Sequence, residues 1–443
     1  MLRKIDRLLD EWADNDQARP LLIRGARRVG KTYAIKRLGE ERFAKQDFAY
    51  LDFQTNLEQL SLVFSQTSDI ERIVSDLAQI LRREIVAKKT LIALDEVQLC
   101  ESALNSLRFF AESDYRVIAT GSQLGLTMRN RSLPFPSGIE VIDLHPMDFE
   151  EYLWAAGEQV VGNAIRESFY TKSRLIIHDE ALKLYRQYTV IGGMPTVVSA
   201  FLNSQDHDQV RTLQAEIDHT YSADIALYAP SDSVVHTLAV WSSIPRQLAR
   251  ENTRKFKYAD VASGGRERVY RTPLAWLEAA SLVSLNYQTN ETTAPLIARD
   301  GGSFFKVYLA DTGIMFYRLN LDAEVFLDDS RRSGLSPRFR GALAENYVMQ
   351  ALTANNLETF YWTPGTTSQN EIEFVLQNRL GQIVPIEVKS GDNVRSASLS
   401  TYLQKTGAPY AIRLSTRNFG YENSIFSVPL YAAFCIDEKS LMS

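Results

Sequence analysis

The sequence predicts an α/β protein with a parallel sheet in its N-terminal part, and two observations support this. A short apolar run at 20–24 leads through a glycine-rich loop into a helical pattern, and four apolar residues at 91–94 precede two carboxylates. Unbroken apolar runs are typical of strands that are buried on both faces of a parallel sheet. Further strand patterns at 48–53, 115–120 and 139–144 complete the predicted core.

The glycine-rich loop has the spacing G-x-x-x-x-G-K-[ST] of a phosphate-binding P-loop. Its residues are Gly25, Ala26, Arg27, Arg28, Val29, Gly30, Lys31 and Thr32. Backbone N–H groups of such a loop cradle phosphates, the lysine reaches the β and γ oxygens, and the Thr32 hydroxyl is placed for Mg²⁺. A plain glycine turn is the alternative, but the flanking strand and helix are the context that the motif needs. The loop therefore predicts binding of ATP with Mg²⁺.

The carboxylates Asp95 and Glu96 follow the apolar run at 91–94. Ligands of open α/β sheets bind at the carboxyl ends of the strands, so we expect both acids beside the P-loop. Asp95 could order the Mg²⁺ shell and Glu96 could polarise the attacking water. The next strand ends at Thr120 and Ser122, either of which could sense the γ-phosphate, although a simple polar turn is the alternative.

Length and composition narrow the class of protein. With 443 residues, 45% hydrophobic and 23% charged, the chain should fold into three or four globular domains. The net charge of −5 argues against an overall basic surface. No run of eighteen apolar residues occurs, and the two cysteines and five histidines show no metal-ligand spacing. We therefore expect a cytoplasmic protein that does not cross a membrane.

The predicted domains are a nucleotide-binding core at 1–160, a helical lid at 161–230, a winged-helix-like region at 231–322, a linker at 323–337 and a C-terminal domain at 338–443. The lid is interrupted by the turn signal Gly192-Gly193-Met194-Pro195. The winged-helix-like outline consists of helical patterns at 234–251 and 269–280 followed by strands at 282–285 and 304–310.

A local basic region lies inside the winged-helix-like outline. Eight basic and three acidic residues occur from Arg246 to Arg271. Such a region could neutralise DNA phosphates. A solvated face or a subunit contact is an equally good interpretation.

The C-terminal domain carries a second group of acids. Glu345 lies in a helical pattern at 339–352, and two strand patterns at 371–377 and 383–389 form a hairpin if the turn is centred on Leu380. This register places Glu373 opposite Glu387, with Lys389 on the same face. Acids that face each other across two strands are destabilising unless a cation or a proton compensates their charge. A divalent-metal site, with Lys389 holding a water or a phosphate, and a solvated face with Lys389 as counter-ion are both consistent with the spacing.

These motifs together resemble the prokaryotic AAA-type ATPases whose C-terminal domain of unknown function is similar to the restriction-endonuclease, PD-(D/E)xK, fold. The resemblance covers almost the whole chain. It rests on the P-loop, Leu94-Asp95-Glu96-Val97-Gln98, Thr120-Gly121-Ser122, Gly192-Gly193-Met194-Pro195, Ala344-Glu345-Asn346 and Ile386-Glu387-Val388-Lys389-Ser390-Gly391.

The resemblance implies roles for individual residues. Lys31 and Thr32 would bind phosphate and Mg²⁺, Asp95 and Glu96 would serve hydrolysis, and Ser122 would stand at the sensor position. The nuclease-like constellation would consist of Glu345, Glu373, Glu387 and Lys389, with Glu373 and Glu387 as metal ligands. Members of the family usually have Asp where this chain has Glu373.

The sequence thus predicts an Mg²⁺-dependent ATPase coupled to a winged-helix and nuclease-like module, with DNA as the expected partner. The alternative is a nucleotide-gated scaffold with an inactive nuclease-like domain and a protein partner. A homo-oligomer is expected because AAA-type sites are often completed by an arginine from a neighbour. The candidates for that arginine are Arg129, Arg131 and Arg246.

Overall fold

The computed structural model describes residues 1–122, 137–250, 255–298, 302–364, 371–391 and 397–442. The chain divides into two compact units. The first holds residues 2–145 with the short stretch 279–281, and the second holds residues 146–278 and 282–443.

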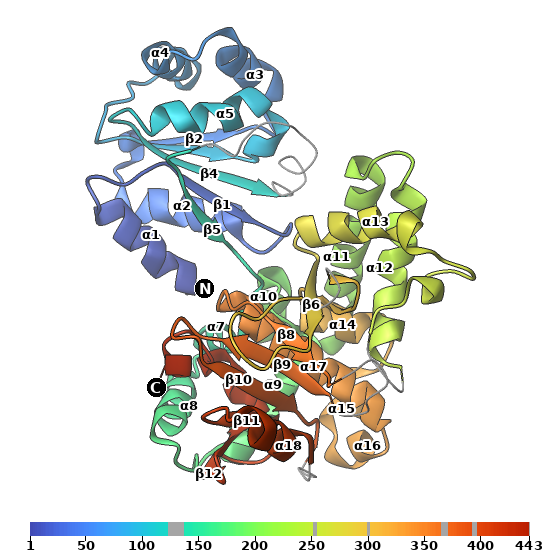
Figure 1. Cartoon of the computed structure of the whole chain (residues 1–443). Coiled ribbons are helices and arrows are strands. Elements are labelled where there is room, and N and C mark those ends of the chain that lie inside the picture. Colours follow the sequence, from blue (N-terminus) through green and yellow to red (C-terminus); the bar gives the residue numbers. More distant parts are fainter. Residues whose placement is uncertain (123–136, 251–254, 299–301, 365–370, 392–396, 443) are drawn as a thin grey trace. The chain divides into compact units, whose positions relative to one another are not determined.

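The first unit is built on a five-stranded sheet of order β2-β3-β4-β1-β5, in which every pairing is parallel (Figure 1). Its strands are β1 (Leu21–Gly25), β2 (Phe48–Asp52), β3 (Leu91–Asp95), β4 (Arg116–Ser122) and β5 (Glu140–Asp143). All residues of β3 are buried, as the unbroken apolar run predicts. The parallel sheet expected from the sequence is confirmed.

Helices cover both faces of this sheet (Figure 1). They are α1 (Lys4–Asp14), α2 (Lys31–Arg42), α3 (Leu57–Gln66), α4 (Ile70–Leu81) and α5 (Glu101–Phe110), with a short 3-10 helix at Val97–Leu99. The apolar faces of α3, α4 and α5 form one continuous core with side chains from the strands. Parallel strands need crossover connections, which are usually helices, so the helices between these strands agree with the parallel pairing.

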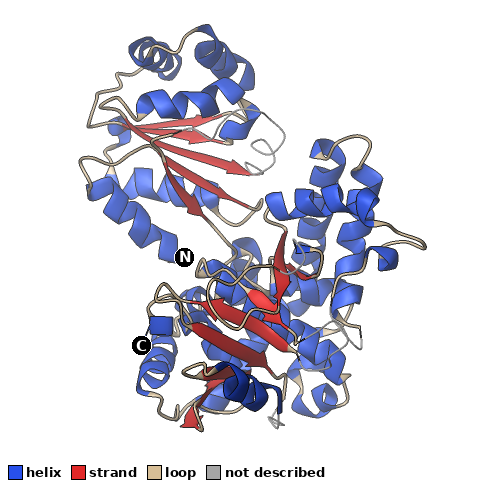
Figure 2. Cartoon of the chain, viewed as in Figure 1, coloured by secondary structure: helices blue, strands red, loops and turns tan. Residues whose placement is uncertain are grey.

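The second unit contains an eight-stranded mixed sheet of order β12-β13-β11-β10-β9-β8-β6-β7 (Figure 2). Its strands are β6 (Val283–Thr289), β7 (Phe305–Leu309), β8 (Phe360–Trp362), β9 (Ile372–Gln377), β10 (Ile383–Val388), β11 (Ala411–Ser415), β12 (Gly420–Glu422) and β13 (Ile425–Pro429). The antiparallel pair β6–β7 is the hairpin of the predicted winged-helix-like region. However, β6 also pairs in parallel with β8, so this hairpin shares one sheet with the strands of the predicted C-terminal domain.

The helices of the second unit surround this sheet (Figure 2). They are α7 (Phe149–Ala155), α8 (Gln159–Thr171), α9 (His178–Ile191), α10 (Pro195–Ser204), α11 (His207–Tyr228), α12 (Val234–Leu248), α13 (Glu267–Ala279), α14 (Thr312–Arg318), α15 (Ala323–Leu327), α16 (Asp329–Ser333), α17 (Pro337–Ala354) and α18 (Ala397–Thr406). Among the described helices, none has the length and apolar character needed to span a bilayer.

Hydrogen bonds join the helices predicted as a lid to the segments that follow β11 and β13 of this sheet. The side chain of Asn418 bonds both backbone groups of Leu175, at 2.9 and 2.8 Å. The ring nitrogens of His178 lie 2.9 Å from the Tyr431 hydroxyl and 3.0 Å from the Thr416 carbonyl. The segment that leads into α9 is therefore part of the second unit's core.

The Gly192-Gly193 turn joins α9 to α10, as the break in the helical pattern predicts, and it also holds α14. The carboxylate of Asp311, at the N-terminus of α14, accepts the N–H of Gly193 at 2.6 Å. The Gly193 carbonyl accepts the N–H of Met147 at 2.7 Å. A Cβ on Gly193 would lie 2.0 Å from the Met147 oxygen, so only glycine fits this position.

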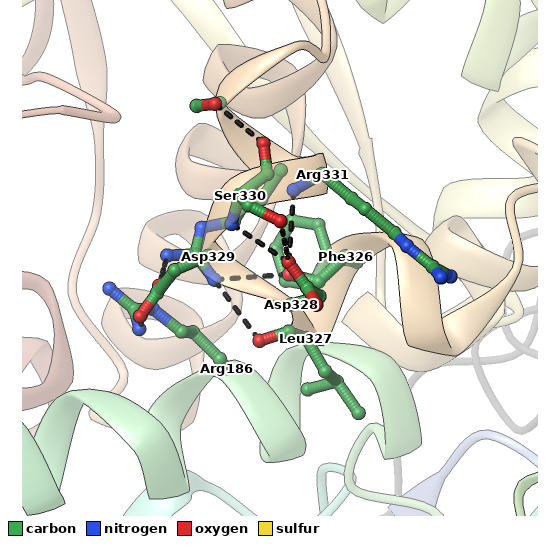
Figure 3. Close-up of polar contacts among 9 residues, drawn as sticks. Arg186, Phe326, Leu327, Asp328, Asp329, Ser330 and Arg331 are labelled. Atoms are coloured by element: carbon green, nitrogen blue, oxygen red, sulfur yellow. Dashed lines mark hydrogen bonds and ion pairs between the residues drawn. The ribbon is translucent and has the colours of Figure 1, made fainter.

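The polar stretch predicted as a linker contains two short helices, α15 and α16 (Figure 3). Asp328 lies between them and accepts the N–H groups of Ser330 at 2.8 Å and Arg331 at 3.0 Å. Such a side chain satisfies otherwise unpaired donors at a helix start. Asp329 then pairs with Arg186 of α9 at 2.8 Å, which ties the linker to the helical layer.

Candidate functional sites

The P-loop lies between β1 and α2. Gly25 and Gly30 have φ angles of 150° and 105°, which residues with a side chain rarely adopt. A Cβ on Gly25 would lie 2.1 Å from the Leu144 carbonyl oxygen. Gly30 precedes the first residue of α2, so the unpaired N–H groups of that helix start face the loop. The φ angles of both glycines give the loop the tight turn that the P-loop spacing predicts.

Lys31 is only 4% exposed and stands over the loop. Its Nζ donates to the carbonyls of Gly25 at 3.0 Å and Ala26 at 2.8 Å. An ammonium in this place can also bond phosphate oxygens on the loop. Thr32 lies beside it in the first turn of α2, partly exposed. Both predicted residues thus lie in the first turn of α2, next to the loop.

Arg3 holds the loop in place through hydrogen bonds, and the sequence did not predict this role. Its guanidinium donates to the carbonyl of Val29 at 3.0 Å and to the carbonyl of His145 at 2.9 Å. Arg3 is only 7% exposed. An arginine ahead of an amphipathic helix carries no local signal of this role, because the contacts join it to residues far along the chain.

Asp95 ends β3 and is buried. One carboxylate oxygen accepts the hydroxyl of Tyr50 at 2.6 Å, and the other accepts the hydroxyl of Thr120. Burial, and then the bond to Asp95, raises the pKa of Tyr50, so the phenol stays a donor. Donors on both neighbouring strands therefore orient this carboxylate.

Glu96 has a left-handed backbone, with φ of 57°, directly after β3. Its Oε2 accepts the Ser122 hydroxyl at 2.8 Å and the Gln98 amide at 2.5 Å. The Gln98 amide also lies 3.2 Å from the Ser122 hydroxyl, which closes a small polar triangle. Ser122 is the register partner of Gly25. The structure thus brings Glu96, Ser122 and the P-loop strand together at one edge of the sheet.

The second group of predicted residues lies on the sheet of the second unit. The pairing of Ile383 with Gln377 and of Ile386 with Phe374 agrees with the hairpin centred on Leu380. Glu387 is 1% exposed, and its carboxylate pairs with Lys389 at 3.2 Å and Arg413 at 3.4 Å. Arg413 was missed, because it belongs to a separate strand, β11.

Glu373 and Glu345 adjoin this pair. The N–H of Val388 donates to Glu373 at 3.2 Å. Burial raises the pKa of Glu373, an effect that Lys389 and Lys306 oppose. Glu345, on α17, is buried and accepts the Tyr308 hydroxyl at 3.1 Å.

These acids do not present a vacant ligand set. Within the described residues, no group of three Asp, Glu, His or Cys side chains is arranged to hold a metal ion. The two cations on Glu387 agree with Lys389 as a counter-ion, but this face is not solvated as that alternative expected, since Glu387 is 1% exposed. The prediction that Glu373 and Glu387 are metal ligands gains no support from this geometry.

Of the three arginines predicted as candidates to complete a neighbouring subunit's nucleotide site, the structure describes only Arg246. Arg129 and Arg131 lie outside the described residues. Arg246 donates to the Asp260 carbonyl at 3.1 Å. In the same basic region, Arg250 pairs with Asp260, and Lys257, Arg266 and Arg268 are exposed.

Three parts of the chain match known protein families. Residues 17–153 match the family described as AAA domain. Residues 182–325 and 340–432 match two families described as domains of unknown function, DUF8612 and DUF4143. No curated protein matches the chain in sequence.

Two similar solved structures are distant. The crystal structure of Cdc6p from Pyrobaculum aerophilum has 14% identity and a TM-score of 0.26, over 75% of this chain and 93% of that chain. The structure of Drosophila ORC bound to DNA has 13% identity and a TM-score of 0.22, over 68% of this chain and 89% of that chain. These scores are low, so the family match and the site geometry carry the assignment.

The parallel sheet, the P-loop and the family match identify the first unit as an AAA-type P-loop domain. Domains of this family generally bind and hydrolyse ATP. The predicted AAA-type core is confirmed at this level.

Proposed function

We propose that the protein is an Mg²⁺-dependent ATPase that acts on DNA from the cytoplasm, as a homo-oligomer. The observation that carries the proposal is the edge of the first sheet, where Lys31 follows β1 and Asp95 and Glu96 lie at the end of β3. Hydrogen bonds hold all three side chains there. The buried ammonium of Lys31 and a loop backbone that only glycine allows support nucleotide binding at this site.

Each residue has a distinct part in this proposal. Lys31 binds the phosphates, Thr32 and Asp95 hold Mg²⁺, and Glu96 orients the attacking water while Ser122 positions Glu96. The Mg²⁺ ion supplies charge neutralisation to the phosphates when it is bound. Glu96 is suited to its part because hydrogen bonds from Ser122 and Gln98 fix the orientation of its carboxylate.

The test is ATP hydrolysis by the purified full chain, with and without duplex and single-stranded DNA. Lys31→Ala should abolish nucleotide binding, whereas Glu96→Gln should bind ATP and fail to hydrolyse it. Stimulation by DNA that both substitutions remove would support the proposal. Hydrolysis indifferent to DNA would reject the DNA part.

The basic surface around α13 supports DNA as the partner. Lys257, Arg266 and Arg268 are exposed there, in a protein with a net charge of −5. Phosphate contacts of this kind weaken steeply with salt. Arg266→Glu with Arg268→Glu should remove DNA binding and leave basal hydrolysis intact. Normal DNA binding by this variant would direct the search to another surface.

The second unit is also consistent with the proposed restriction-endonuclease-like fold. The helix α17 is followed by the strands β8, β9 and β10, then by α18 and β11, which pairs in parallel with β10. A fold does not establish an activity.

A nucleotide-gated scaffold that binds a protein partner is the second candidate function. The observation that favours it is the pairing of Glu387 with Lys389 and Arg413. Binding of a partner protein that depends on ATP, without DNA cleavage, would support this candidate.

A further inference from the structure

Strand β7 carries a lysine that no motif singled out. Lys306 has no exposed side-chain surface, and the strand's other residues are buried apolar or aromatic side chains. An isolated ammonium in such surroundings is strongly disfavoured unless carboxylates pair with it. Lys306 must therefore be explained by its partners.

Two carboxylates from different parts of the unit meet at Lys306. Its Nζ lies 2.5 Å from an oxygen of Glu371, directly before β9, and 3.5 Å from an oxygen of Glu345 on α17. The face of the Tyr361 ring, whose centroid is 5.2 Å away, adds a cation–π contact. The ammonium thus contacts α17, β8 and the residue that precedes β9.

These contacts continue into the pairs around Glu387. Glu373 interacts electrostatically with Lys306 and Lys389, and also with Glu387 and Glu371. We define the acidic cluster as Glu345, Glu371, Glu373 and Glu387. Its cations are Lys306, Lys389 and Arg413, so three cationic side chains of this chain face its four carboxyl groups.

We propose that Lys306 is the fixed internal cation of the acidic cluster and serves there in place of a divalent ion. The cluster then binds no divalent metal and cleaves no nucleic acid. This inference rests on the proposed restriction-endonuclease-like fold of the second unit.

The physical reason is competition for the same carboxylates. A divalent ion on Glu387 would lie close to Lys389 and Arg413, which pair with that carboxylate. An ion on Glu373 would meet the charges of Lys306 and Lys389, and one on Glu345 and Glu371 would lie close to the ammonium that they share. Like charges at such a distance repel strongly in a protein interior. A metal would also need oxygen ligands that are free to converge, and the described residues contain no such group.

The test is Mn²⁺ binding to the nucleotide-free full chain, followed by electron paramagnetic resonance, together with thermal unfolding with and without Mn²⁺. The wild type should bind no Mn²⁺ at the acidic cluster. Lys306→Met removes the charge at similar length, so its Tm should fall by at least about 5 °C, because a buried pair has been broken. Mn²⁺ should restore part of that loss in the variant and leave the wild-type Tm unchanged.

Matched variants separate charge from packing. Lys306→Arg keeps the positive charge and should bind no Mn²⁺. Lys306→Met combined with Glu371→Gln removes one charge of each sign and should be more stable than Lys306→Met alone. A double variant no more stable than the single one would overturn the role of Lys306.

Mn²⁺ binding by the wild type that Glu387→Gln abolishes would also overturn the proposal, as would metal-dependent cleavage of plasmid DNA with the same dependence. If Lys306→Met does not fold, the wild-type titration and the cleavage assay still decide. The experiment uses no nucleotide, so its outcome is independent of whether the first unit hydrolyses ATP.

Discussion

Removal of the Ser122 hydroxyl tests the role of the polar triangle at the nucleotide site. Ser122 lies at the tip of β4 and donates to the Glu96 carboxylate at 2.8 Å. If this bond holds Glu96 in the orientation that activates water, Ser122→Ala should lower kcat and leave ATP affinity unchanged.

The expected size of the effect follows from the hydrogen bonds. A bond to a charged group contributes about 1.5–3 kcal/mol, and each 1.36 kcal/mol is about a tenfold change in rate. The Gln98 amide still donates to the same oxygen at 2.5 Å, so the lower end, about a tenfold loss of kcat, is expected. Gln98→Leu added to Ser122→Ala should deepen the loss to about a hundredfold.

The assay is steady-state ATP hydrolysis together with equilibrium binding of a fluorescent ATP analogue. Ser122→Thr is the matched control, since it keeps the hydroxyl and should retain most activity. A kcat within twofold of wild type would show that the bond does not orient Glu96. A raised kcat would show that Ser122 holds Glu96 away from the water, the opposite of the role argued above.

Two further predictions concern the second unit. Gly193→Ala should lower stability by about 3 kcal/mol in chemical denaturation because its Cβ would lie 2.0 Å from the Met147 oxygen, whereas Gly162→Ala, whose nearest neighbour is 3.6 Å away, should raise it by about 0.5–1 kcal/mol. Burial raises the pKa of Asp311 from 3.8 to about 6, so the folded state prefers the protonated acid and loses about 3 kcal/mol of stability as pH rises from 4 to 7. Asp311→Asn should show no such loss, and parallel stability–pH curves for the two proteins would refute the assignment.

Local patterns were sufficient to predict the strands and the helix that carry the candidate nucleotide-site residues. The strand before the P-loop, the helix after it and the acids at the end of β3 are each encoded within a few residues, and the parallel sheet places them at one edge. The hairpin register was predictable for the same reason, because its turn is short and its partners are close in sequence.

Long-range pairing was not predictable from such patterns. The bonds between Leu175 and Asn418 join residues 243 positions apart. Similarly, the parallel pairing of β6 with β8 joins strands on either side of the predicted linker. A sequence without an alignment holds no signal that identifies these partners, so helices of the second unit were assigned to a lid and its sheet was divided between two domains.

The two lysines of the acidic cluster show why a motif and a physical environment give different information. Lys389 was found because its spacing from Glu387 matches a pattern, and its side chain is 32% exposed. Lys306 was missed, although a lysine inside the apolar run 304–310 is anomalous by composition alone, and its side chain has no exposed surface. Because its side chain is fully buried, Lys306 needs carboxylate partners to offset the cost of burying its charge. About a third of the Lys389 side chain is exposed, so water can solvate its ammonium at little cost. The lysine outside the motif is therefore the one whose removal should decide what the acidic cluster can bind.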